Sequence, residues 1–210
     1  MGAKSWAAAG IAVVVALVVV IVITTKTDRP ESEAADAVSM ENPPATTAVG
    51  VDSLPPWPVP ADATAAARDA GLPMLSSEGM VEHIHVHFDV LVDGRPVSVP
   101  ANIGIDAARG AISPLHTHDD SGVIHIESPV KRQFSLGEFF SEWQVSLSAD
   151  NIGGLRSTNG KTVRTYVNGQ PRAGNPAAIM FAQHDEIALV YGQPQPGEKV
   201  PTKYDFPPGD

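Results

Sequence analysis

Val81 to Asp89 reads Val-Glu-His-Ile-His-Val-His-Phe-Asp, which sets three histidines at every second position. In a β-strand, side chains two residues apart leave the same face of the sheet. His83, His85 and His87 therefore share one face, and the apolar residues between them share the other. The stretch predicts a strand with one face for the core and one face of imidazoles.

A tight hairpin is predicted directly after this strand. Asp93-Gly94 stands between alternating apolar runs, which is the strongest short-range signal for a two-residue turn. Register then follows by counting outward from the turn. The expected pairs are Val92 with Arg95, Val90 with Val97, and Phe88 with Val99.

A second group of histidines lies in Leu115 to Glu127, which reads Leu-His-Thr-His-Asp-Asp-Ser-Gly-Val-Ile-His-Ile-Glu. Its polar centre, Asp119 to Gly122, predicts a turn between two strands. His116 is then opposite His125, and His118 lies on the same face. Opposed Cβ atoms in a sheet are roughly 4.5–5.5 Å apart, so these three histidines can converge on one point.

Six of the seven histidines lie in these two stretches, and the chain has no cysteine. Imidazoles without thiolates are typical ligands of zinc or copper(II), so a zinc or copper ion is the predicted cofactor. The histidines expected to supply its ligands are His85, His87, His116, His118, His125 and, with less support from its place at the strand's start, His83. The carboxylates expected to orient these imidazoles are Asp89, Glu127 and Asp119. The seventh histidine, His184, is most simply a turn residue.

The charge of the chain bears on its partners. The 210 residues carry a formal net charge of −10 and give a pI near 5.0. Binding to phosphates needs a clustered Lys and Arg surface, so nucleic acid is not an expected partner.

An uncharged apolar run near the N-terminus, Ala7 to Ile23, has roughly the 20 residues that a bilayer span requires. We predict a short tail at residues 1–6 and a transmembrane anchor at residues 7–24. A cleaved secretory signal is the alternative, although its apolar region is usually shorter. The short leading tail favours a single-pass protein of the cell membrane with its C-terminal domain outside the cytoplasm.

Composition divides the rest of the chain into three parts. Residues 25–72 are rich in Pro and Ala and predict a tether, with a short helix at Ala61 to Ala70 that Asp62 caps. Residues 73–192 form the predicted histidine-rich domain. Residues 193–210, rich in Pro and Gly, are expected on the surface.

The domain is expected to be α+β. Ser135 to Trp143 carries apolar residues at helical spacing, and Ser135 with Glu138 forms a capping box. The remaining segments read as strands, which gives a mostly antiparallel sheet with one packed amphipathic helix. A β-grasp-like arrangement is the predicted fold, and a β-sandwich is the alternative. The expected core residues are Phe88, Val90, Ile124, Ile126, Phe139 and Trp143.

Several motifs extend this pattern across the chain. They are His83-x-His85-x-His87-x-Asp89, Leu115-His-Thr-His-Asp119, His125-x-Glu127-Ser-Pro129, His184-Asp-Glu-Ile187 and Tyr204-Asp-Phe-Pro207. From Glu82 to about Pro208 the chain resembles an uncharacterised family of membrane-anchored or exported proteins of bacteria and archaea. The resemblance implies domain limits and an exported setting, but no reaction.

These observations favour a tethered domain that binds a divalent transition metal through its histidines. A metal-dependent enzyme is one alternative, in which three histidines leave a position for water and Glu127 or Asp119 acts as general base. A structural or interaction module of the cell envelope is the other, in which the histidines only make hydrogen bonds.

Overall fold

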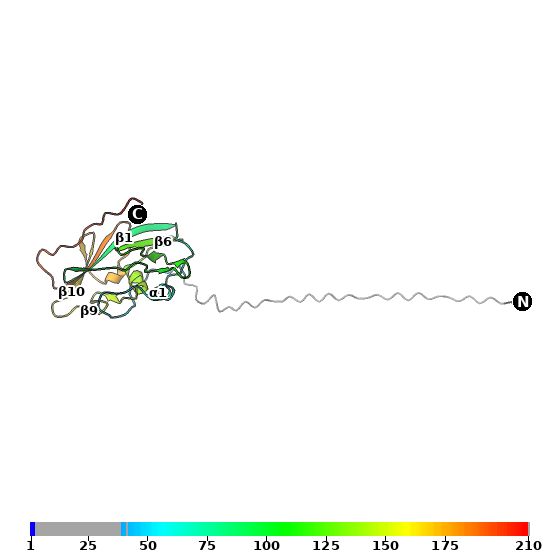
Figure 1. Ribbon diagram of the computed structural model, residues 1–210, viewed down its shortest axis with the longest axis horizontal. Helices are drawn as coiled ribbons and strands as arrows, with labels where there is room; N and C mark the ends of the chain where they lie inside the picture. Colours follow the sequence, from blue (N-terminus) through cyan, green and yellow to red (C-terminus); the bar gives the residue numbers. More distant parts are fainter. Residues whose placement is uncertain (3–38, 41, 210) are drawn as a thin grey trace. The chain divides into compact units, whose positions relative to one another are not determined.

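The computed structural model describes residues 1–2, 39–40 and 42–209 (Figure 1). Residues Ala37–Asp210 form one compact unit. Its elements are α1 (Ala63–Asp69), β1 (Glu82–Val92), β2 (Arg95–Val97), β3 (Ile105–Asp106), β4 (Ala111–Ile112), β5 (Leu115–His116), β6 (Val123–Ser128), α2 (Leu136–Glu142), β7 (Leu147–Ser148), β8 (Asn151–Ile152), β9 (Leu155–Arg156), β10 (Thr162–Val167), β11 (Gln170–Arg172), the 3₁₀ helix η2 (Pro176–Ala178) and β12 (Glu186–Gly192).

One seven-stranded sheet organises the unit. Its strand order is β11-β10-β12-β1-β6-β5, and β2 also pairs with β1. The neighbours in this sheet are antiparallel, except that β12 runs parallel to β1. The α+β class is confirmed by these sheets and helices. The finer β-grasp-like arrangement stays a prediction.

Strand β1 changes partner along one of its edges. Its C-terminal end pairs with β2 at Val90–Val97 and Val92–Arg95, as the turn predicted. The predicted pair of Phe88 with Val99 is wrong, because β2 ends at Val97 and β6 takes that edge. The Phe88 amide donates instead to the carbonyl of Gly122, at 2.9 Å. The histidine half of β1 is thereby joined to the second histidine strand.

Helix α2 packs on the apolar face of this sheet. Its capping box is formed as predicted, because Ser135 Oγ accepts from the Glu138 amide and the Glu138 carboxylate accepts from the Ser135 amide. The rings of Phe139 and Phe140 lie against Phe88, with centroids 6.3 and 5.5 Å away. All six predicted core residues are buried in one cluster, so that prediction is confirmed.

The segment before the sheet belongs to the same core. The predicted short helix is present as α1, where Asp62 accepts from the Ala65 amide at 3.0 Å. Trp57 is only 2% exposed and meets Trp143 edge to face at 5.7 Å. Residues 42–72 are therefore not a free spacer. Burial of the large Trp57 indole stabilises the folded protein even though prolines surround it in the sequence. The rest of the predicted tether, apart from residues 39–40, lies outside the described residues.

The predicted location needs a correction. Within residues 1–2, 39–40 and 42–209, no helix is both long and apolar enough to cross a membrane. The predicted single-pass protein with an external domain therefore finds no membrane-spanning helix in this part of the chain. The run from Ala7 to Ile23, which prompted that prediction, lies outside the described residues.

Candidate metal centre

Three neighbouring strands bring the histidines together. In β1 and β6, His85 pairs with His125, and in β5 and β6, His116 pairs with the same His125. One row of imidazoles thus runs across the sheet. In the next row, His83 of β1 pairs with Glu127 of β6. The register counted within the second hairpin predicted the pairing of His116 with His125. The antiparallel pairing of β1 with β6 then brings the histidines of β1 next to this pair.

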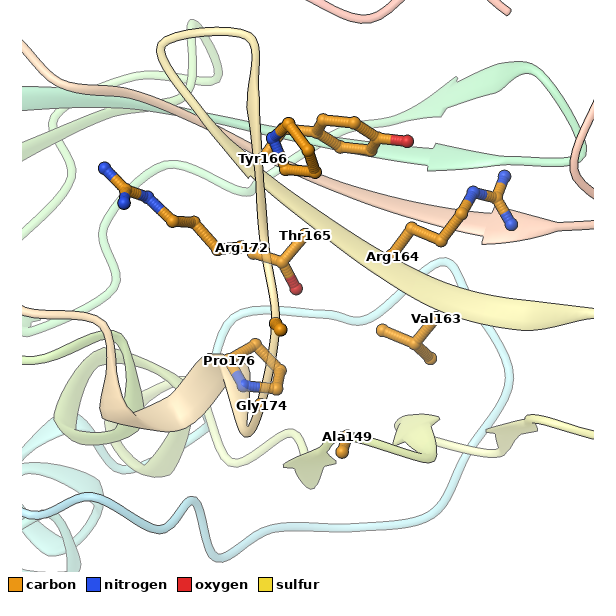
Figure 2. A pocket seen from close by; sticks show the side chains of 10 residues that line it. Ala149, Val163, Arg164, Thr165, Tyr166, Arg172, Gly174 and Pro176 are labelled. Atoms are coloured by element: carbon orange, nitrogen blue, oxygen red, sulfur yellow. The ribbon is translucent and has the colours of Figure 1, made fainter.

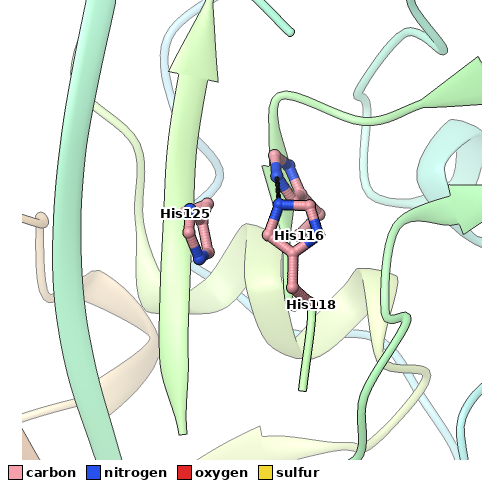
Figure 3. Close-up of side chains that lie close together, drawn as sticks. All are labelled: His116, His118 and His125. Carbon is pink, nitrogen blue, oxygen red and sulfur yellow. Dashed lines mark hydrogen bonds between the residues drawn. The ribbon is translucent and has the colours of Figure 1, made fainter. Parts of the chain in front are cut away.

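His116, His118 and His125 form the closest group (Figure 3). One ligand atom from each lies within 4.8 Å of the others. His116 Nε2 accepts a hydrogen bond from His118 Nε2 at 3.2 Å, and the His118 and His125 ring centroids are 4.5 Å apart. His118 lies just past the end of β5, because that strand ends at His116.

The environment of His116 fixes its protonation. Its side chain is fully buried, and its Nδ1–H donates to the carbonyl of Ser113 at 2.9 Å. Burial lowers the pKa of His116 to about 4, so the ring is neutral near pH 7. With its proton on Nδ1, the ring presents the lone pair of Nε2 toward His118, which suits a metal ligand.

Glu127 is the carboxylate at the centre of the cluster. Its side chain is 4% exposed, and its Oε1 accepts from His125 Nδ1 at 3.2 Å. Burial opposes ionisation, yet the hydrogen bond from His125 and the surrounding imidazoles of His116 and His83 hold the pKa of Glu127 below its usual value. The group is therefore a charged acceptor that orients His125 with its Nε2 toward the cluster.

His83 and His85 approach the same carboxylate from β1. His83 Nε2 lies 3.6 Å and His85 Nε2 lies 3.7 Å from Glu127 Oε1. One ligand atom from each of these three residues falls within 4.8 Å of the others. His85 also meets His125 edge to face, with ring centroids 4.5 Å apart. These two predicted ligands therefore lie beside the first group and share Glu127 with it.

His87 is set apart from the other predicted ligands. Its Nδ1 donates to Glu186 Oε2 and its Nε2 to the Ser121 carbonyl, each at 2.8 Å. Burial alone would lower the pKa of His87, but these hydrogen bonds and the carboxylates of Glu186 and Asp89 raise it. His87 therefore keeps a proton to higher pH than an ordinary histidine, and both of its ring nitrogens are engaged in hydrogen bonds. Asp89, with a carboxylate oxygen 3.7 Å from His87 Nδ1, belongs with His87 and Glu186 to a separate group whose ligand atoms lie within 4.8 Å of one another.

The C-terminal segment covers His87. Tyr204 stacks on the His87 ring at 3.9 Å with the two planes 4° apart, and Phe206 stacks on His184 at 4.7 Å. The predicted surface tail is thus held against His87 of β1 and against the turn residue His184.

Two further predicted residues have local roles. Asp119 Oδ1 accepts from the Ser121 amide at 2.9 Å, and hydrogen bonds from Ser121 lower the pKa of this exposed carboxylate. It stabilises the bend between His118 and β6. His184 is an exposed turn residue with a φ of 63°, as the sequence indicated.

Sequence reasoning missed four groups around the cluster. Glu78 Oε1 lies 3.6 Å from His118 Nε2, the Ser113 carbonyl holds His116, and Glu186 and Tyr204 hold His87. Glu186 faces His87 through the parallel pairing of β1 and β12, which no hairpin count can reveal. The Tyr204 motif was visible in the chain, but its contact with His87 was not.

A cavity of about 380 Å³ lies elsewhere on the unit (Figure 2). Its lining comes from β10, β11 and the segments near Ala149 and Pro176, and includes no histidine. Arg164 on its wall is paired with Glu198 at 2.9 Å. This cavity is therefore separate from the imidazole cluster.

No protein-family model matches the chain, and neither a curated protein nor a solved structure matches it. The resemblance to an uncharacterised exported family accordingly stays a prediction.

Proposed function

We propose that the protein binds a divalent transition metal ion, zinc or copper(II), through the imidazoles of His116, His118 and His125. The separation of 3.2 Å between His116 Nε2 and His118 Nε2 carries this proposal. Two imidazole nitrogens on a tetrahedral zinc, each roughly 2.0–2.1 Å from the ion, lie about 3.3 Å from one another. The protein thus holds two nitrogens almost at the spacing that an ion requires.

Preorganisation supports the same function. His116 is neutral and fixed by Ser113, so its ring has neither to lose a proton nor to turn to accept a metal, and Glu127 already orients the ring of His125. Carboxylate and carbonyl acceptors behind the imidazoles are the usual partners of metal-bound histidines. Three such ligands also leave a coordination position for water or a further group.

Titration calorimetry of zinc and of copper(II) into the metal-free full-length protein, purified without a histidine tag, tests the proposal. We expect binding of at least one of these metals tighter than about 10 μM, and we expect the bound metal to raise the unfolding temperature. Because ligation needs neutral imidazole, uptake should weaken as pH falls below about 6.5.

Matched variants assign the site. His118→Ala, at a partly exposed position, should reduce this uptake, as should His116→Ala. His184→Asn is the control, because it removes a turn histidine while asparagine tolerates the positive φ there. The proposal is rejected if the unsubstituted protein takes up neither metal, or if uptake is unchanged in both cluster variants. The histidines would then have a hydrogen-bonding role.

A further inference from the structure

Glu127 and the two histidines of β1 make a second group beside the proposed one. Glu127 Oε1 lies 3.6 Å from His83 Nε2 and 3.7 Å from His85 Nε2. These separations are near the roughly 3.3 Å expected between ligands of one tetrahedral ion. Two histidines and a glutamate are also a known zinc ligand set that leaves one position open.

The carboxylate itself supplies an independent indication. Glu127 is 4% exposed, and its Oε2 is buried with no hydrogen-bond partner among the described residues. A buried charged oxygen without a partner is costly unless a cation or donor meets it. Oε2 lies 3.9 Å from His116 Nε2, a nitrogen that carries no proton when Nδ1 donates to Ser113. A bound cation would compensate this buried oxygen.

We propose that the protein holds a second divalent transition metal ion, with zinc the best fit, at His83, His85 and Glu127. The inference rests on the proposed function, because the same carboxylate would ligate the second ion and orient His125 toward the first. The histidine face then carries a pair of neighbouring sites linked by Glu127. The His83 side chain is 38% exposed, which gives the second site an opening to solvent.

Zinc stoichiometry distinguishes the two sites. The full-length metal-free protein is dialysed against buffered zinc, and bound zinc per chain is measured by elemental analysis. We expect two ions for the unsubstituted protein, one for His83→Ala and one for His118→Ala. The double variant should bind none, and His184→Asn should bind two.

Each other result overturns one or both proposals. If the unsubstituted protein binds one ion, and this ion is lost in His118→Ala but kept in His83→Ala, the second site is rejected and the first is kept. If the single ion is instead lost in His83→Ala and kept in His118→Ala, the pair of sites is rejected and the ion is assigned to the histidines of β1. No bound zinc rejects the second site outright, whereas the copper(II) titration still decides the first.

Glu127→Gln gives a second measurement should His83→Ala alter the fold. It keeps the shape of the side chain but removes its charge. We expect the variant to lose the second ion and to bind the first about 10–100-fold more weakly, because the acceptor for His125 is weakened. Retention of two ions by Glu127→Gln rejects the linked pair.

Discussion

His116 makes the metal-free protein sensitive to acid. Its pKa is about 4 in the folded state, against about 6.5 for an unfolded histidine. Below pH 6.5 the unfolded chain therefore takes up a proton that the folded protein refuses, so stability falls as pH drops toward 4. Between about pH 7.5 and pH 4.5 this one residue should cost roughly 2–3 kcal/mol of unfolding free energy.

Urea unfolding of the metal-free protein at the two pH values measures this loss. His87 has a raised pKa, so its ion pair contributes stability below pH 6.5 and loses it as pH rises, which opposes the effect of His116. The comparison is therefore with the pH dependence of His116→Phe, which keeps His87 and Glu186 and removes the buried titration. Equal pH dependence in the two proteins would show that His116 is not held neutral.

At this scale, the sequence predicted much of the site but not all of it. Alternation placed His83 and His85 on one face, and the hairpin count paired His116 with His125. His87 obeys the same alternation, but its partner Glu186 comes from a strand 99 residues away. A local pattern shows which way a side chain leaves a strand, and only the tertiary structure shows which acceptor it meets.

At the scale of elements, the contact of α2 with the sheet is open to measurement. Phe139 is fully buried against Phe88, Phe140 and Trp143. Phe139→Ala should lower the free energy of unfolding by about 3–5 kcal/mol, because it removes a ring and leaves a cavity. Denaturant unfolding of both proteins checks this value.

The matched control is Gln133→Ala, an exposed position just before the same helix, which should change stability by less than about 0.5 kcal/mol. A loss below about 1 kcal/mol for Phe139→Ala would mean that α2 does not pack on the sheet as described.

Elements with strong local signals were predictable, whereas edge pairings were not. The capping box fixed the start of α2, and Asp93-Gly94 fixed the β1–β2 turn. Strand β1 pairs with β2 at one end and with β6 at the other, because the two strands compete for the same edge. The outcome of that competition cannot be read from the sequence. The small strand β8 has no local pattern of its own, because its two residues are flanked by turn residues and gain their pairs only from β7 and β9.

At the scale of the whole molecule, the folded unit begins well before the predicted boundary at residue 73. We expect a protein of residues 37–210 to unfold cooperatively. A shorter protein of residues 73–210 lacks both Trp57 and α1. Its free energy of unfolding should be lower by about 3–5 kcal/mol or more, because truncating a buried Trp alone costs that much.

Thermal and urea unfolding of the two proteins provide the measurement, with Trp57→Ala in the longer one as the matched variant. Equal stability of the two lengths would restore residues 42–72 to the role of a spacer. Composition suggested that role because the segment is rich in proline. Composition alone cannot show that Trp57 is buried.

The parallel pairing of β1 with β12 has a consequence for the order of assembly. His87 meets Glu186 across 99 residues, whereas it meets the Ser121 carbonyl across only 34. Closing the longer loop costs more chain entropy, and on the ribosome it must await synthesis of the last strand. The face built from β1, β5 and β6 therefore has the lower contact order and is complete in the nascent chain first. A metal ion could meet its imidazoles before the C-terminal third of the protein exists.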